Sequence, residues 1–329
     1  MLDEIWMEIV CRTCKHSGEN MYFFKKWSFL IVSGAILLSI VGLISGCQSK
    51  YEDLDLTMYE YRDTKDLVKF VYDAALTLKK DGMKSLDYFR NNRNLFKTRD
   101  YYLYIYDMNG TNIYHAGMEH LEGKNLLDIT DKDGKKSLKM ALNALADENN
   151  PHSWVHYSWW EPGKFYPVPK SSCHFKVKTI DGKEYFVGAG LDYPHEEKEF
   201  IRIVVEDAVQ LIKERGPKAF SDIANPVLQY SYRDVRIFAF RPDGEILLSP
   251  VTGDNLSQIK LLECIDEVGH KPFEKALKEL ESKDSVWEVF MAKQRYQRQF
   301  IKKCLYLRKM VVSGEKIYVG AITDLPHPV

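Results

Sequence analysis

The stretch that decides the fold reads Trp154-Val155-His156-Tyr157-Ser158-Trp159-Trp160-Glu161-Pro162-Gly163-Lys164-Phe165-Tyr166-Pro167-Val168-Pro169-Lys170. It combines three tryptophans, two tyrosines, a Pro-Gly turn and a final lysine. Each buried aromatic side chain covers roughly 150–250 Å². Together they exceed the patch of roughly 300–600 Å² that a soluble monomer leaves exposed. These aromatics are therefore expected to form core, an interface or the wall of a pocket.

Length and charge limit the classes of protein that fit. The chain has 329 residues and a formal net charge of −1. This length predicts two domains behind any targeting segment. Nucleic-acid partners are not expected, because phosphate contacts require a basic face that so even a charge balance does not favour.

The N-terminal region is predicted to carry an export signal. Residues 27–46 contain no charged side chain and follow Lys25 and Lys26, so they are long enough to span a bilayer. Residues 43–47, Leu-Ile-Ser-Gly-Cys, resemble the lipobox of bacterial lipoproteins, which implies that Cys47 becomes the acylated first residue. An uncleaved signal anchor is the alternative, and both Met1 and Met21 remain candidate starts. Either way, residues 48–329 are expected outside the cytoplasm. The lipobox favours a membrane-anchored lipoprotein of the periplasm or cell surface.

Beyond residues 1–46, the leader and signal, residues 47–63 are polar without a clear period and are interpreted as a tether. From Thr64, apolar residues recur at steps of three and four, which predicts a long helix. Residues 101–106 then alternate strictly, so one face of a strand carries Tyr102, Tyr104 and Tyr106.

A second half repeats this order. The hairpin at residues 235–248 follows the first hairpin at an offset of about 134, and Trp287 matches Trp154. Residues 318–324 match residues 186–192 in the same way. These landmarks indicate a duplication. We expect an α+β fold with an antiparallel sheet in each copy, divided into domains at 64–195 and 196–329.

The motifs of the first copy carry a family resemblance. Gly123-Lys-Asn-Leu-Leu-Asp128, Asp131-Lys-Asp-Gly134, the aromatic stretch and Val187-Gly-Ala-Gly-Leu-Asp192 together resemble the Cache domain, of the single-Cache type found in bacterial and archaeal chemoreceptors and sensor kinases. The resemblance covers residues 64–195, and the second copy keeps the scaffold motifs alone. It implies two PAS-like modules, each with a long N-terminal helix before an antiparallel sheet with flanking helices. It also implies extracytoplasmic sensing of a small molecule, in a pocket on one face of the sheet with the following loop as its lid.

The candidate ligand-binding residues combine hydroxyl donors, aromatic walls and one cation: Tyr102, Tyr104, Tyr106, His115, Trp154, Tyr157, Trp159, Trp160 and Lys170. Tyrosine hydroxyls suit a small polar ligand, and a lysine pairs with a carboxylate. We therefore expect a small organic acid, with an amino acid or amine as alternatives. Because Trp154 has a counterpart in Trp287, it is expected to lie partly in the core.

The second copy lacks these groups. At the aligned positions the three tyrosines become Arg236, Phe238 and Phe240, and the Trp159-Trp160 pair becomes Ala292-Lys293. The ligand site is therefore assigned to the first copy. A weaker second anion site near Arg236, Arg295 and Tyr296 remains an alternative.

Other chemistry is not indicated. The lone Cys11-x-x-Cys14 lacks a second pair, and residues 128–140 do not fit an EF-hand loop. No nucleophile–base motif and no cofactor loop is visible, so we predict neither an enzyme nor a bound metal or cofactor. The chain continues only five residues past Asp324, so a transmembrane receptor or transporter is the expected partner. The competing hypothesis is an envelope interaction or structural module without a small-molecule ligand.

Overall fold

The computed structural model describes residues 51, 53–146, 152–161, 163–225, 227–233, 235–249, 261–293 and 300–324. Contacts divide the chain into two compact units, Met1–Asp53 and Leu54–Val329, and the second unit contains all elements described below. The predicted signal segment, the Cys11–Cys14 pair and the lipidation site Cys47 lie outside the described residues and stay predictions, as does an anion site that includes Arg295 and Tyr296. Within the described ranges, no helix is both long and apolar enough to cross a membrane.

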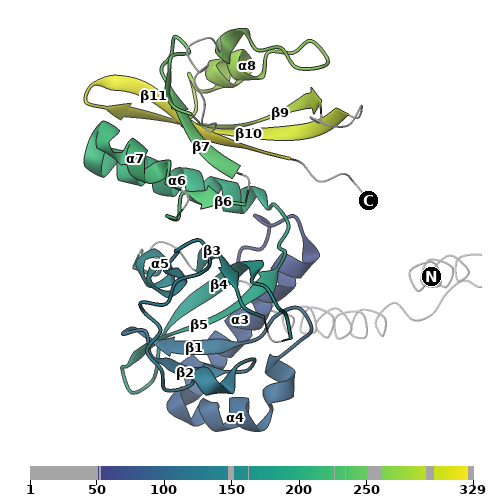
Figure 1. Ribbon diagram of the computed structural model, residues 1–329, viewed down its shortest axis with the longest axis vertical. Coiled ribbons are helices and arrows are strands. Elements are labelled where there is room, and N and C mark those ends of the chain that lie inside the picture. Colours follow the sequence, from purple (N-terminus) through teal and green to yellow (C-terminus); the bar gives the residue numbers. More distant parts are fainter. Residues whose placement is uncertain are drawn as a thin grey trace, which may run out of the picture. The chain divides into compact units, whose positions relative to one another are not determined.

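The first module begins with helix α3 (Arg62–Asp81), as its apolar period predicts. One face of this helix is buried, and it packs against strands β4 (Val168–Lys178) and β5 (Glu184–Asp192) (Figure 1). The helix ends at Gly82, whose positive φ of 58° favours glycine. Short helices follow: η1 (Gly82–Lys84), α4 (Ser85–Asn91), η2 (Arg93–Phe96) and, further on, η3 (Glu119–Leu121).

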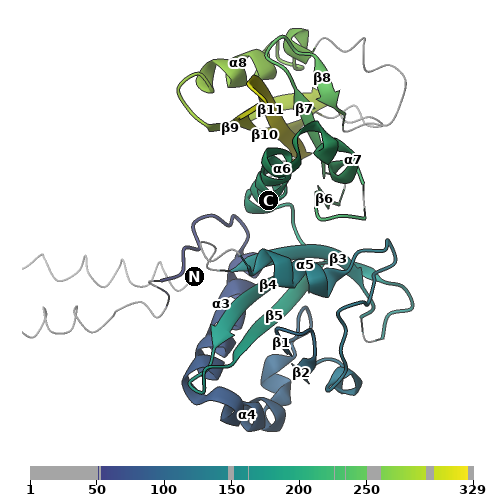
Figure 2. The same cartoon turned by 90° about the vertical axis from the view of Figure 1, so that its left-hand side faces the viewer.

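The first sheet is antiparallel, in the order β2-β1-β5-β4-β3. Its strands are β1 (Tyr104–Asp107), β2 (Asn112–His115), β3 (Ser153–Trp159), β4 (Val168–Lys178) and β5 (Glu184–Asp192). Side chains alternate between its faces: Phe175 contacts Tyr72 of α3, whereas its neighbour His174 points to the opposite face. Helix α5 (Ser137–Ala144) lies alongside β3 (Figure 2). The face opposite α3 is therefore the one on which a ligand pocket can form.

The second module begins with α6 (Lys198–Arg215) and builds a second antiparallel sheet, in which β8-β7-β11-β10-β9 repeats the order of the first. Its strands are β6 (Ser231–Tyr232), β7 (Val235–Phe240), β8 (Ile246–Leu248), β9 (Ser285–Lys293), β10 (Phe300–Val312) and β11 (Glu315–Asp324). Its other helices are η4 (Gly216–Lys218), α7 (Ala219–Ile223), η6 (Leu261–Glu263) and α8 (Pro272–Glu279). The predicted α+β fold with antiparallel sheets is confirmed.

Two residues in the expected tether are packed against the first module. Leu54 and Tyr59 are buried, and the Tyr59 hydroxyl accepts a hydrogen bond from Trp154 Nε1 at 2.8 Å. The same hydroxyl is hydrogen-bonded to His152 Nε2. A segment this short shows no periodicity, so its buried tyrosine gave no signal in the sequence.

One buried carboxylate connects the start of the first module to the start of α6. Glu197 is fully buried and accepts the backbone N–H groups of Glu60, at 2.7 Å, and Tyr61, at 3.0 Å. Glu197 directly precedes α6, while Glu60 and Tyr61 directly precede α3. Burial raises the pKa of the Glu197 carboxyl, and the two N–H donors oppose that shift. The Glu197 carboxylate thus satisfies two backbone donors that directly precede α3.

The substitution Glu197→Ala is expected to lower the free energy of unfolding by about 1–3 kcal/mol, because it leaves these N–H donors unsatisfied. Denaturant unfolding of the full chain measures this change. Glu184→Ala, at an exposed position paired with Lys176, serves as the control and should change stability by less than about 0.5 kcal/mol. Equal effects of the two substitutions would contradict the role of Glu197.

Candidate functional site

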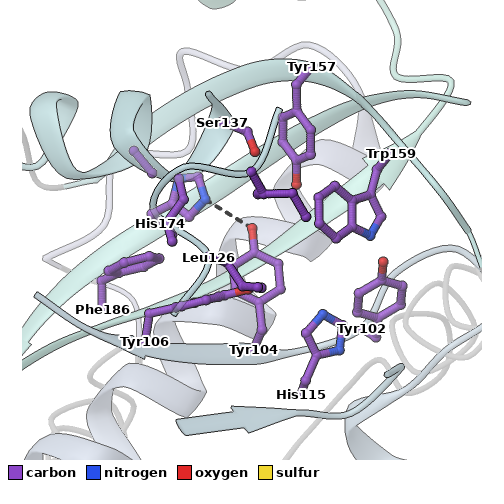
Figure 3. A pocket seen from close by; sticks show the side chains of 13 residues that line it. Tyr102, Tyr104, Tyr106, His115, Leu126, Ser137, Tyr157, Trp159, His174 and Phe186 are labelled. Carbon is purple, nitrogen blue, oxygen red and sulfur yellow. Dashed lines mark hydrogen bonds between the residues drawn. The ribbon is translucent and has the colours of Figure 1, made fainter. Parts of the chain in front are cut away.

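A small cavity lies on the face of the first sheet opposite α3 (Figure 3). Its volume is about 30 Å³, room for about two to three water molecules. Strands β1 to β5 supply most of its wall, and α5 with the preceding loop covers it. The lining residues are Tyr102, Tyr104, Tyr106, His115, Leu126, Ile129, Ser137, Leu138, Ala141, Tyr157, Trp159, His174 and Phe186.

Two glycines of the central strand β5 leave room for the side chains of this face. Gly188 lies between Tyr104 on β1 and His174 on β4 in the strand register. A Cβ atom at Gly188 would lie 2.4 Å from Tyr104 Cε2 and 2.6 Å from His174 Cδ2, closer than real contacts allow. At Gly190, a Cβ would lie 2.3 Å from Ser172 Oγ. The ring of Tyr104 and the imidazole of His174 therefore meet across a strand that has no side chain there.

Neutral hydrogen-bonding groups line the cavity. The Tyr104 hydroxyl is hydrogen-bonded to His174 Nε2 at 3.0 Å, and the Tyr157 hydroxyl to Ser172 Oγ at 2.8 Å. His115 Nδ1 accepts the backbone N–H of Met118 at 2.9 Å, so the neutral ring carries its proton on Nε2. Burial, with a smaller contribution from Lys170, lowers the pKa of His115 to about 3. His115 is therefore an uncharged donor at neutral pH.

Six of the nine predicted residues line this one cavity: Tyr102, Tyr104, Tyr106, His115, Tyr157 and Trp159. Sequence reasoning missed His174, Phe186 and the cover formed by Leu126, Ile129, Ser137, Leu138 and Ala141. Alternation was the available signal for His174, because it lies two and four residues after Ser172 and Lys170. The covering residues had no comparable signal, since they come from a helix and a loop outside the sheet.

Two predicted tryptophans do not reach the cavity, and their assignment is corrected. Trp154 points to the other face of β3, where its ring lies 4.6 Å from that of Phe200. The reason is the two-residue period of a strand, which places Trp154 opposite to Tyr157 and Trp159. Trp160 follows the last residue of β3 and is 57% exposed.

Lys170 lies on the cavity face but does not line the cavity. It is paired with Tyr157 in the strand register, and its side chain is 2% exposed. Its ammonium contacts Glu161 Oε1 at 2.5 Å and Asp192 Oδ1 at 2.8 Å, and it lies 4.7 Å from the centre of the Tyr102 ring. The predicted cation is therefore beside the cavity, already paired with two carboxylates.

The described part of the chain contains no cluster of three His, Cys, Asp or Glu residues that could hold a metal ion. His152 and His156, four apart in sequence, have separate hydrogen-bond partners, Tyr59 and Ser171. Cys173 and Cys304 are free thiols.

The substitution Gly188→Ala is expected to destabilise the first module by about 1–3 kcal/mol through overpacking. In a Tyr104→Ala background the same substitution should cost less, because the ring at 2.4 Å is removed. Denaturant unfolding of the four proteins of this cycle measures the coupling. Strict additivity would show that Tyr104 and Gly188 do not constrain each other.

Four buried histidines make stability depend on pH. Burial lowers the pKa of His115, His156 and His174 to about 3 and that of His152 to about 4, whereas an imidazole in the unfolded chain has a pKa of about 6.5. Below pH 6.5 the unfolded chain binds protons that the folded chain does not. The stability that the folded chain gains from these neutral histidines is therefore complete above pH 6.5 and is lost as pH falls toward 4. By pH 5.5 the loss is on the order of 1 kcal/mol for each histidine.

His174→Gln is expected to flatten this loss, because one titrating group disappears. Melting temperatures of both proteins between pH 7.5 and 5 measure the slope. An unchanged slope would mean that His174 is protonated in the folded chain.

Comparison with known proteins places these features in a family. The sensor histidine kinase MctS of Rhizobium johnstonii is 30% identical over 93 residues, which are 28% of this chain and 19% of that protein. The chain thus spans about a fifth of the length of this curated relative.

Solved structures that match parts of this chain include sensor domains. A methyl-accepting chemotaxis protein of Vibrio parahaemolyticus is 21% identical, with 40% of this chain and 88% of that chain covered and a TM-score of 0.33. A Cache chemosensory domain solved for its carboxylic acid recognition is 20% identical, with 40% and 94% covered and a TM-score of 0.33. The periplasmic sensory domain of the Campylobacter jejuni chemoreceptor Tlp1 is 12% identical, with 78% and 87% covered and a TM-score of 0.29.

The sequence profile of the Cache domain matches residues 83–311, which reach from the first module into β10 of the second. This range is more than half of the chain. The protein therefore belongs to the Cache-domain family.

Proposed function

We propose that this protein is an extracytoplasmic sensor that binds a small organic molecule, with a carboxylate favoured, in the cavity of its first module. The observation that carries the proposal is the convergence of tyrosine hydroxyls and a neutral histidine N–H on one cavity above Gly188. Pockets of this kind, apolar with a few oriented polar groups, are typical of small-molecule sites. The proposed role is binding without catalysis.

The size of the cavity favours a small ligand. A volume of about 30 Å³ holds about two to three heavy atoms, so even a two- to four-carbon acid enters only when the lining side chains move apart. Phe186 and Tyr106, whose rings stack at 5.3 Å, close one end. A bulky or polymeric ligand does not fit this enclosure.

The chemistry of the lining favours a ligand rich in acceptors. His115 offers its Nε2–H, and the hydroxyls of Tyr104 and Tyr157 are each able to donate. A carboxylate accepts several such bonds at once, whereas an amine requires acceptors or an anion. The two carboxylates beside the cavity, Glu161 and Asp192, are engaged with Lys170. An amino acid remains the second candidate, because it also carries a carboxylate.

The second module supports the assignment to the first. There Phe238 and Phe240, which replace Tyr104 and Tyr106, are buried in one apolar cluster with Phe273 of α8. Phe273 stands where the first module has Leu138, at an offset of 135 residues. A larger side chain thus fills the position that covers the cavity in the first module.

The proposed mode of action is through a partner. The lipobox-like sequence at Cys47 supports a lipid-anchored sensor outside the cytoplasm, and the match to a sensor histidine kinase supports signalling through a transmembrane kinase or chemoreceptor. The division into modules at residues 64–195 and 196–329 is part of this proposal. The repeated strand order supports it.

A second candidate function is protein interaction without a small ligand. The loop after β3 favours it, because Trp160, Phe165 and Tyr166 are all exposed, Phe165 by 96%. Both functions are compatible with the fold, and ligand screening separates them.

The proposal predicts that a small carboxylate stabilises the full chain in a thermal-shift screen of acetate, propionate, pyruvate, succinate, glycine, alanine and small amines. At a hundredfold excess over the dissociation constant, linkage gives a stability gain of about 2.7 kcal/mol. No shift with any compound would overturn the proposed function and favour the interaction module.

Substitutions that copy the second module localise the site. Leu138→Phe, which copies Phe273, should fill the cavity and abolish the shift, and Tyr104→Phe, which copies Phe238, should weaken binding about tenfold through loss of one hydroxyl. Tyr185→Phe, on the opposite face of β5 from the cavity residue Phe186, is the matched control and should bind normally. Unaltered binding by Leu138→Phe would place the ligand elsewhere.

A further inference from the structure

The geometry points to Glu161 as an internal competitor for the ligand: its carboxylate makes the contacts with Lys170 and Tyr102 that the carboxylate of a bound organic acid takes over. This inference rests on the proposed function and adds how the site is regulated. It makes Glu161, rather than Lys170 alone, the residue that sets the affinity for acids.

The first step of the argument is the saturation of Lys170. Its ammonium has three N–H donors, and it has three oxygen neighbours: Glu161 Oε1 at 2.5 Å, Asp192 Oδ1 at 2.8 Å and the carbonyl oxygen of Gly190 at 3.2 Å. The side chain is nearly inaccessible to solvent. A ligand therefore reaches this cation only by replacing one of the three oxygens.

The second step identifies the replaceable oxygen. Gly190 and Asp192 both belong to β5, the central strand, and Asp192 is paired with Lys170 in the register with β4. Glu161 lies two residues beyond the end of β3, in the connection to β4. Its backbone is not fixed by strand pairing, so Glu161 is the partner that moves at least cost.

The third step connects Glu161 with the cavity. The Tyr102 hydroxyl donates a hydrogen bond to Glu161 Oε1 at 3.0 Å, and the ring of Tyr102 lines the cavity. Oε1 of Glu161 thus accepts from both Lys170 and Tyr102. When Glu161 leaves, one ammonium N–H and one hydroxyl become available together, at the edge of the cavity, and a ligand carboxylate accepts from both.

The charge balance of the cluster permits this exchange. The cluster holds one cation and two carboxylates, and burial together with Glu161 raises the pKa of the Asp192 carboxyl against the opposing effect of Lys170. The ligand anion takes the place of Glu161 beside Lys170, so it restores the pairing of the ammonium and meets the same repulsion from Asp192. The net charge of the buried cluster stays unchanged by the exchange.

The exchange also supplies an output. Glu161 is flanked by Trp160, and its loop carries the exposed rings of Phe165 and Tyr166. The exchange at Glu161 therefore takes place directly beside an exposed aromatic surface on which a partner can detect a shift of this loop.

The decisive experiment compares the full-length wild type with Glu161→Gln by titration calorimetry, with acetate, propionate and pyruvate as probes. Glu161→Gln removes the competing charge and keeps the size, so its affinity for the acids should rise at least tenfold. Glu161→Asp keeps the charge on a shorter arm and should show a smaller gain. Glu184→Gln, an exposed carboxylate paired with Lys176 on the same sheet, is the matched control and should leave affinity unchanged.

The outcomes separate this inference from the proposed function. Wild-type binding with equal or weaker binding by both Glu161 variants would overturn the competitor role and leave the proposed function intact. Binding by Glu161→Gln alone would support both, with Glu161 as the dominant barrier. Absence of binding in every variant would overturn the proposed function and this inference with it. In the double variant Glu161→Gln, Lys170→Met, the gain in affinity for acids should vanish. If the gain persists, the charge of Glu161 does not act through Lys170.

Discussion

The cavity of the first module depends on the contact between Tyr104 and His174 across Gly188. β5 lies in the middle of its sheet and pairs with β1 and β4, so a side chain at this position would separate the rings that form the cavity wall. Glycine in a strand interior normally weakens the strand. Here that weakness is offset by the pairing on both edges, and the result is a concave face built from a continuous sheet.

Lys170 contributes a different constraint. A buried ammonium requires compensating anions, because the low dielectric of the interior makes an unpaired charge costly. The fold supplies two carboxylates, one on a paired strand and one on a loop, and they differ in how firmly the backbone holds them. Asp192 lies on a strand and Glu161 lies in a loop. The cluster therefore keeps one firmly held carboxylate while the other can be exchanged.

Much of this arrangement follows from sequence patterns. Alternation in residues 101–106 placed the tyrosines on one face, and the glycines of residues 187–192 belonged to the motif set that suggested the family. Alternation along β3 also places Trp154 on the opposite face from Tyr157 and Trp159. Their shared aromatic character had suggested one common site. The pairing of Lys170 with Glu161 and Asp192 could not be predicted from the sequence, because it depends on strand register and on the path of a loop. The buried Tyr59 was missed for a related reason, since a single anchoring residue has no period.

The carboxylate of Glu197 holds the chain entering α3 and lies at the residue preceding α6. The segments that enter α3 and α6 are thus joined by two hydrogen bonds, and the stacked rings of Tyr61 and His195 and the ion pair of Lys198 with Glu60 join them as well. A force on the segment before Arg62 is therefore shared between the start of α6 and, through Tyr59 and Trp154, strand β3 of the first sheet. Mechanically, the entry to α3 couples the first sheet to the helix that begins the second module.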